Sequence, residues 1–198
     1  MGLNLDYISG QTPLDEDEKE GLLIPTIATR EELDEFEQQN IEDALQWVLG
    51  KTLKAETILT EKFIRSLHKR MFGHVWSWAG KYRKTNKNLG IDKWQIPFAL
   101  KALCDDTLFW IQNETFSPDQ IAIQFKHKIV CIHCFPNGNG RHSRLMADII
   151  INKIFNLPLF SWGANNLTHQ NDARTHYLKA LKAADRGHYE MLLKFVRS

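Results

Sequence analysis

Cysteine is scarce in this chain of 198 residues: the three present, Cys104, Cys131 and Cys134, are too few and too irregularly spaced for a disulfide framework. The run from Cys131 to Cys134 crowds its potential ligands, and no second Cys/His pair follows, so a structural zinc site is not predicted. Long apolar runs are also missing, and the first twenty residues lack the basic region of a signal peptide. We therefore expect a cytoplasmic protein with reduced thiols and no membrane contact.

An excess of either charge is lacking as well. The chain has 25 Lys and Arg against 24 Asp and Glu, a net charge of +1, so direct nucleic-acid binding is not expected. The hydrophobic fraction of 43% suffices for a packed core. Acidic residues gather between positions 15 and 20, which is typical of a solvated face. Pro13 and Pro25 interrupt residues 1–28, which we interpret as an N-terminal arm before one domain over 29–198.

Helical patterns dominate from Thr29 onward, so the predicted fold class is mainly α. Thr29 and Glu32 form a capping box, and Ser117 with Gln120 forms another ahead of an apolar stripe. Predicted helices cover about 29–50, 56–72, 97–113, 117–133, 141–155, 171–184 and 188–196. Residues 73–96 differ, because glycines and aromatics cluster there. The turn residues Asn86–Gly90 and the alternation over Trp94–Ile96 predict a small β-hairpin.

The segment from His133 to Arg144 carries the most information about chemistry. A helix ends at His133, a loop with two glycines follows, and a new helix begins. Successive amides in such a loop form a concave anion site, and it empties into an electropositive helix N-terminus. Arg141 and Arg144, three residues apart, add two guanidinium groups suited to phosphates. An imidazole at the loop entrance can take a proton from an attacking hydroxyl.

Each of these features alone has a common structural explanation: a buried histidine, a plain turn, two solvated arginines. Their combination within twelve residues favours a nucleotide site. The loop is not a Walker A motif, because no Gly-Lys-Ser/Thr ends it, and it is not the dinucleotide fingerprint, because a helix precedes it.

The segment resembles the signature of the Fic family, His-Pro-Phe-x-Asp/Glu-Gly-Asn-Gly-Arg-x-x-Arg. The matching residues are His133, Phe135, Gly138, Asn139, Gly140, Arg141 and Arg144. Gly80-Lys81-Tyr82-Arg83 is similar to the start of the family's target-binding flap, and residues 177–185 are similar to the helix that follows its active-site helix. The resemblance spans 31–195, and the arrangement is similar to stand-alone bacterial Fic proteins of the mobile mystery protein B type.

The resemblance implies a Fic-type helical domain with a β-hairpin flap that transfers AMP from ATP to a Ser, Thr or Tyr hydroxyl of a target protein. His133 would take the hydroxyl proton, and Phe135 would anchor the loop. The nucleotide would be held by Gly138, Asn139, Gly140, Arg141 and Arg144, with Tyr177 bordering the base pocket or packing in the core. The flap would pair with the target through Thr85, Asn88, Gly90 and Ile91.

Two positions depart from the signature. Cys134 replaces a proline, which we interpret as a packing variation. Asn137 replaces the acid that binds Mg²⁺ in the family, so the metal would meet a neutral amide oxygen. Asn137 could instead only close the turn.

Regulation follows no complete family pattern. The inhibitory Ser/Thr-x-x-x-Glu-Gly/Asn helix has no full match, so either a separate antitoxin protein supplies the glutamate against Arg144 or the N-terminal arm inhibits in another way. The competing functions are transfer of another nucleotide or phosphate-containing group on the same fold, and a non-catalytic nucleotide-binding module.

Overall fold

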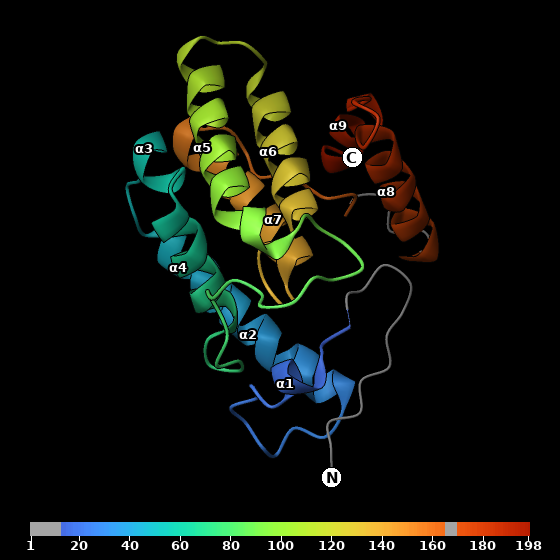
Figure 1. Ribbon diagram of the computed structural model, residues 1–198. Coiled ribbons are helices and arrows are strands. Elements are labelled where there is room, and N and C mark those ends of the chain that lie inside the picture. Colours follow the sequence, from blue (N-terminus) through green and yellow to red (C-terminus); the bar gives the residue numbers. More distant parts are fainter. Residues whose placement is uncertain (1–12, 165–169) are drawn as a thin grey trace.

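The computed structural model describes residues 13–164 and 170–198 and shows a mainly helical domain (Figure 1). The predicted fold class is therefore confirmed in its main feature. The helices are α1 Glu16–Lys19, α2 Arg30–Leu49, α3 Ala55–Ile58, α4 Glu61–Phe72, the 3-10 helix η1 Lys93–Gln95, α5 Ile96–Gln112, α6 Pro118–Ile132, α7 Asn139–Ile149, the π-helix η2 Ile150–Ile154, α8 Gln170–Ala184 and α9 Glu190–Val196.

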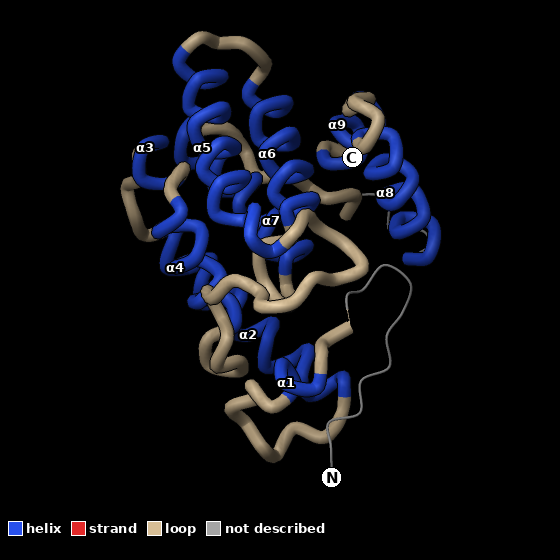
Figure 2. The backbone as a smooth tube through the Cα atoms, in the orientation of Figure 1, coloured by secondary structure: helices blue, strands red, loops and turns tan. Residues whose placement is uncertain are grey.

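Helix α6 lies at the centre of this arrangement. It packs against α5 and α7 and also contacts α9. Helices α8 and α9 pack against each other and lie at one side of the domain (Figures 1 and 2). The predicted apolar stripe of α6 is buried: Ile121, Phe125, Ile129 and Ile132 are each at most 7% exposed. Burying such side chains contributes about 1.5–3 kcal/mol each. The same burial fixes the end of α6, and therefore His133, inside the domain.

The helix starts follow the predicted caps. Thr29 and Ser117 each accept the amide three residues on, and the side chains of Glu32 and Gln120 return the hydrogen bond. The single helix predicted over 56–72 is wrong, because the structure has two helices there, α3 and α4, and the helical conformation is interrupted between them. There Thr60 adopts an extended conformation and its hydroxyl caps α4, which local apolar periodicity could not reveal.

The β-hairpin predicted within 73–96 is also wrong, since residues 84–92 form an irregular loop with bends and the described residues contain no strand, only an isolated bridge between Leu22 and Trp76. Side chains form hydrogen bonds with the backbone carbonyl and amide groups that strand pairing would need. The Arg83 guanidinium donates to the carbonyls of Thr85 and Ile91, and the Asn86 side chain accepts the Lys93 amide at 2.9 Å. The segment is therefore folded onto the body.

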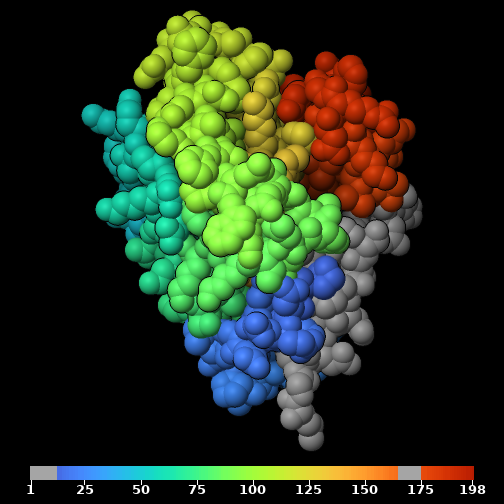
Figure 3. Space-filling model, in the orientation of Figure 1, coloured from blue at the N-terminus to red at the C-terminus, as the bar shows by residue number. Residues whose placement is uncertain are grey.

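Residues 13–28 pack along the same face. The Leu23 amide donates to the Val75 carbonyl at 2.8 Å, and the Trp78 indole donates to the Glu18 carbonyl at 2.9 Å. In the space-filling view the blue arm lies against the green segment that follows α4 (Figure 3). Within the described ranges, no helix is both long and apolar enough to cross a bilayer.

Candidate active site

His133 ends α6 in a left-handed conformation, with φ 57° and ψ 61°. Only a few per cent of non-glycine residues adopt positive φ, and such strained positions gather at functional sites. Its carbonyl accepts a hydrogen bond from Arg83 Nε at 2.6 Å, and its side chain is 5% exposed. Burial and the neighbouring Arg83 charge lower the pKa of His133 to about 4, against a hydrogen bond to the Val130 backbone. The imidazole is therefore neutral at pH 7 and able to accept a proton.

Asn139 shapes the loop that follows. Its side-chain oxygen accepts the Phe135 amide at 3.0 Å, and its side-chain nitrogen donates to the Phe135 carbonyl at 2.8 Å. Both ends of this buried amide thus hold the loop, which leaves the backbone of Asn139 to contact phosphate. Gly138 adopts φ 76° at the start of α7, where a Cβ would lie 2.6 Å from the Phe72 ring. No other residue fits there without strain.

Gly140 and Asn137 differ in how their surroundings are filled. Gly140 is exposed, and a Cβ built on it would meet nothing within 4 Å, so the first turn of α7 faces open space. The Asn137 side-chain oxygen accepts the Gly138 amide at 2.6 Å, which is the turn-closing contact expected of asparagine. That oxygen is the one the loop could offer to a cation.

Two buried histidines hold the loop from beneath. His68 stacks on Phe135 with ring centroids 3.7 Å apart, accepts the Gly80 amide on Nδ1 and donates from Nε2 to the Asn137 carbonyl. His142 Nε2 lies 3.0 Å from the Ile64 carbonyl. Burial lowers the pKa of His68 well below its usual value and that of His142 to about 4, so both are neutral structural groups.

The two arginines of α7 have different neighbours. Arg141 Nη1 lies 2.5 Å from the buried Glu37 carboxylate and rests over the Phe72 ring. Arg144 is exposed and lies over Tyr177, with its guanidinium carbon 4.8 Å from the ring centroid. Arg144 is the arginine open to a ligand, whereas Arg141 is already paired with the core.

Tyr177, on α8, sits between two cations. The ammonium group of Lys126, a fully buried side chain on α6, lies 4.9 Å from the same ring. Lys126 and Arg144 lower the pKa of Tyr177 against the opposing effect of burial. The structure thus brings Tyr177 beside Arg144, and its role at the base pocket stays a prediction.

Of the four predicted flap residues, Gly90 lies against His133, and Ile91 is linked to it through Arg83. Gly90 packs so closely that a Cβ there would lie 2.6 Å from that of His133. The Ile91 carbonyl accepts from Arg83, and the Thr85 hydroxyl donates to Asp15 at 2.7 Å. Asn88 is exposed at the outer turn.

The Fic/DOC family model matches residues 58–151, which contain every element of this loop and both of its flanking helices. The chain carries a Fic/DOC domain. Solved structures share the fold: Fic-1 of C. elegans gives a TM-score of 0.65 at 22% identity, covering 90% of this chain and 51% of that one. The BepC effector of Bartonella tribocorum, solved with AMPPNP, gives 0.62 at 15% identity, covering 92% and 97%.

Curated relatives of the Fic domain are named "Protein adenylyltransferase Fic". The Aedes aegypti protein is 24% identical over 160 residues, and the Nematostella vectensis protein is 26% identical over 168 residues. These matches cover 79% and 83% of this chain but 30% and 38% of those proteins. The chain therefore spans well under half the length of the relatives it matches.

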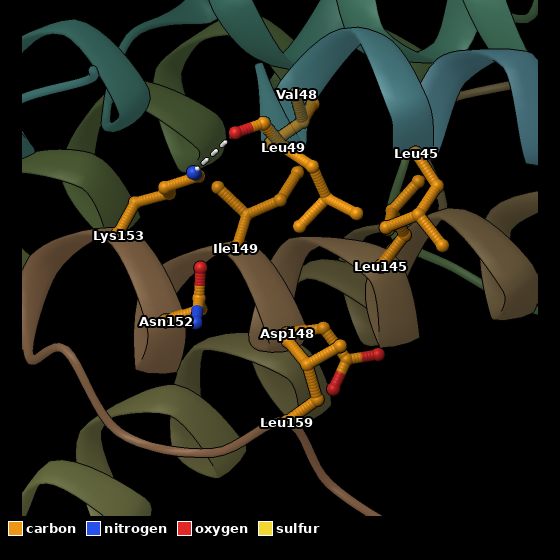
Figure 4. A pocket seen from close by; sticks show the side chains of 9 residues that line it. All are labelled: Leu45, Val48, Leu49, Leu145, Asp148, Ile149, Asn152, Lys153 and Leu159. Atoms are coloured by element: carbon orange, nitrogen blue, oxygen red, sulfur yellow. Dashed lines mark hydrogen bonds between the residues drawn. The ribbon is translucent and has the colours of Figure 1, made fainter. Parts of the chain in front are cut away.

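The Fic domain also has a small hollow between α2 and α7 that is separate from the loop (Figure 4). Its volume is about 10 Å³, which is room for about one water molecule. Leu45, Val48 and Leu145 line it with other side chains, and Lys153 closes one side by donating to the Leu49 carbonyl at 3.0 Å. A nucleotide cannot enter this space.

Sequence reasoning missed Glu37 and His68, and it named Arg83 only as part of the flap start, without its contact to His133. Each contacts the loop or its arginines from far away in the chain: Glu37 is 104 positions from Arg141, His68 is 69 from Asn137, and Arg83 is 50 from His133. The sequence offered one signal. Glu37 and His68 are polar residues at buried positions of their helices, and Arg83 lies beside the predicted flap, but none of these positions reveals the contact partner.

Proposed function

We propose that this Fic domain transfers AMP from ATP to a Ser, Thr or Tyr hydroxyl of a target protein. The hydroxyl oxygen attacks the α-phosphorus, and His133 takes the hydroxyl proton. The bond between the α-phosphorus and the oxygen that bridges it to the β-phosphorus breaks, and pyrophosphate leaves. The observation that carries the proposal is a neutral, strained His133 at the entrance of a loop that opens into a helix N-terminus. The adenylyltransferase names of the relatives support it.

The triphosphate would lie over the first turn of α7. The open space at Gly140 leaves room for it, and the backbone amides of residues 138–140 supply a nest of donors. Arg144 would hold the outer phosphates, and Tyr177 would border the nucleotide. Arg141 would contribute once phosphate competes with Glu37 for its guanidinium. The AMPPNP bound to the BepC effector supports ATP as the substrate class.

Magnesium would enter with the ATP phosphates. The segment from His133 to Arg144 contains no Asp or Glu, so the loop offers a neutral oxygen from Asn137. An amide oxygen is an accepted ligand of Mg²⁺, which usually keeps several waters and phosphate oxygens. Bound Mg²⁺ would neutralise charge on the leaving pyrophosphate. Asn137 would then give up its hydrogen bond to Gly138.

The target protein would dock beside residues 85–91. Trp94 and Phe98, one helical turn apart, are 75% and 78% exposed next to this segment. Exposed apolar side chains mark a protein-binding surface where they form a contiguous patch, and we propose that these two rings belong to one. Because Arg83 binds carbonyls of this segment, the segment is not free to pair with the target as a strand. The target would instead contact the exposed side of residues 85–91 and the rings of Trp94 and Phe98.

Regulation would act in the cytoplasm through the arm or an antitoxin protein. The ammonium of Lys87, whose side chain is 5% exposed, lies 2.8 Å from Asp15 and 2.6 Å from Glu18, so the arm fastens the segment that covers His133. Release of this contact would expose the site. A separate antitoxin would instead place a carboxylate on Arg144, where it competes with phosphate.

Labelling tests the proposal. Purified protein is incubated with a bacterial lysate and ATP, CTP, GTP or UTP, each labelled on the α-phosphate. Protein-bound label from ATP alone supports AMP transfer, and label from another nucleotide identifies the related reaction. ATP binding without any labelled protein, with or without the arm contact intact, overturns the enzymatic proposal in favour of a nucleotide-binding module.

A further inference from the structure

A second cluster of polar side chains lies on the other side of α6, where that helix meets α8 and α9. His127 and Cys131 are four residues apart and so share one face of α6. Asp185 follows the last turn of α8, and its carboxylate lies 2.8 Å from His127 Nε2. The Cys131 sulfur lies 3.7 Å from the same nitrogen, and all three ligand atoms lie within 4.8 Å of one another.

From this geometry we propose that His127, Cys131 and Asp185 bind a zinc-type divalent cation. A tetrahedral zinc with Zn–N of 2.0–2.1 Å and Zn–S of about 2.3 Å places its N and S ligands about 3.6 Å apart. The observed separation matches this spacing. The His127–Asp185 separation would widen to roughly 3.4 Å for the same geometry, which a rotation of the exposed Asp185 side chain supplies.

Tyr189 completes the arrangement from outside the ligand set. Its hydroxyl lies 3.2 Å from His127 Nδ1, on the ring nitrogen that faces away from Cys131 and Asp185. Histidine ligands of metals nearly always donate their second ring N–H to a carboxylate, a backbone carbonyl or water, which fixes the tautomer, and the Tyr189 hydroxyl oxygen can accept that N–H in the same way. With the His127 proton on Nδ1 and the Cys131 thiol deprotonated, the Nε2 lone pair, the sulfur and the Asp185 carboxylate are all available to one metal ion.

The turn after α8 explains why two of these groups meet the ring. Gly187 adopts φ 86°, and the His188 amide donates back to the Ala183 carbonyl at 3.1 Å. The chain therefore reverses tightly and places Asp185 and Tyr189 at the two ring nitrogens of His127. A histidine, a thiolate and a carboxylate together select Zn²⁺ over Mg²⁺ or Ca²⁺. Three protein ligands leave a fourth position for water.

Binding would have a structural consequence for the nucleotide site. His127 is adjacent to Lys126, and α8 carries Tyr177 beside Arg144. A metal ion bound by residues of α6 and of the end of α8 would fix the position of α8, and with it Tyr177, relative to α6. Burial and the nearby Asp185 raise the pKa of the Cys131 thiol. Because the thiol must lose its proton to ligate a metal, binding would release a proton.

Cobalt(II) is the probe, because a thiolate ligand gives it a near-ultraviolet charge-transfer band. The metal-free 198-residue chain is titrated with Co²⁺ and then with Zn²⁺. We expect one equivalent to bind with this band, and Zn²⁺ to displace it. Cys131→Ser, which changes one exposed sulfur, removes the band while leaving the protein folded. Tyr189→Phe weakens binding roughly tenfold, the scale for a lost outer partner.

The matched control is His74→Ala, which removes an exposed histidine remote from the cluster and should titrate like the wild-type protein. Two results overturn the proposal. One is no cobalt binding above that of Cys131→Ser, which leaves a Tyr–His–Asp hydrogen-bonded group. The other is equal binding by wild type, Cys131→Ser and His127→Ala, which would assign the metal to scattered surface histidines.

Discussion

Arg141 and Glu37 form an ion pair across 104 positions of sequence, with 2.5 Å between Nη1 and Oε2. The Trp76 indole donates to the other Glu37 oxygen at 2.6 Å, so both carboxylate oxygens are satisfied inside the domain. Glu37 is 5% exposed at its side chain, whereas Arg141 is 35% exposed. The pair joins α2 to the first turn of α7 and thereby links the body to the loop that we propose binds phosphate.

This asymmetry predicts unequal effects of removing each partner. Arg141→Ala strands a buried carboxylate and should lower the free energy of unfolding by about 3–5 kcal/mol. Glu37→Ala leaves an arginine that can reach water and an unpaired indole, so a smaller loss of about 1–3 kcal/mol is expected. Urea denaturation measures both. Addition of Glu37→Gln to Arg141→Ala should recover stability, and equal losses from the two single variants would contradict the asymmetry.

His133→Ala should reduce labelling by about a hundredfold to ten-thousandfold while ATP binding stays close to that of the wild type. The imidazole lies at the loop entrance, away from the arginines that we propose hold the phosphates. His74→Ala, which alters an exposed histidine outside the site, is the control. Labelling by His133→Ala near the wild-type level would remove this residue from catalysis.

The depressed pKa of His133 predicts the pH dependence of labelling. A base must be unprotonated, and this group protonates only near pH 4. Labelling should therefore stay level as the pH falls from 8 to about 5.5, where an unperturbed histidine with a pKa near 6.5 would already be mostly protonated. Initial rates at saturating ATP across this range decide the matter. A loss centred near pH 6.5 would show that the bound state restores an ordinary pKa.

Asn137→Asp should lower the magnesium concentration for half-maximal labelling by about tenfold to a hundredfold, because it adds a negative charge beside a divalent ion. Asn137→Ala, which removes both the oxygen and the hydrogen bond to Gly138, should raise that concentration. Magnesium titrations of labelling compare the three proteins. Superimposable curves would mean that residue 137 closes the turn and does not touch the metal.

Lys87→Ala should increase labelling several-fold if the arm covers the site. The variant removes the ammonium that Asp15 and Glu18 hold at 2.8 and 2.6 Å. A nearby lysine without these partners, Lys84→Ala, is the control because it is exposed at the same segment. Faster proteolysis within residues 13–28 of Lys87→Ala should accompany the gain. Unchanged labelling with a released arm would assign inhibition to a separate protein.

Acid should destabilise the domain through its buried histidines. His142 has a folded pKa of about 4 and His68 is depressed as well, against 6.5 when unfolded. Their stabilising contribution is complete above pH 6.5 and is lost as the pH falls toward 4, at about 1.4 kcal/mol per pH unit for each proton taken up. Urea denaturation at pH 7 and pH 5 measures this. His142→Gln should show a shallower decline, and parallel declines would contradict the assignment.

Local chemistry in the sequence was enough for the starts of α2 and α6 and for the position of the loop. The caps at Thr29 and Ser117 involve residues three apart, and the His133–Arg144 segment carries its glycines, helix start and arginines within twelve positions. Short separations of this kind are fixed by backbone geometry, so a pattern can predict them.

Tertiary structure alone decided which of those groups are open to a ligand. The sequence placed Arg141 and Arg144 as equals, but only packing shows that Arg141 is paired with Glu37 while Arg144 is exposed beside Tyr177. The predicted hairpin failed because Arg83, whose guanidinium is bound to the His133 carbonyl 50 positions away, also donates to the carbonyls of Thr85 and Ile91. Contacts between residues 50 to 104 positions apart depend on how helices pack, and packing is a property of the whole buried interior that no local pattern contains.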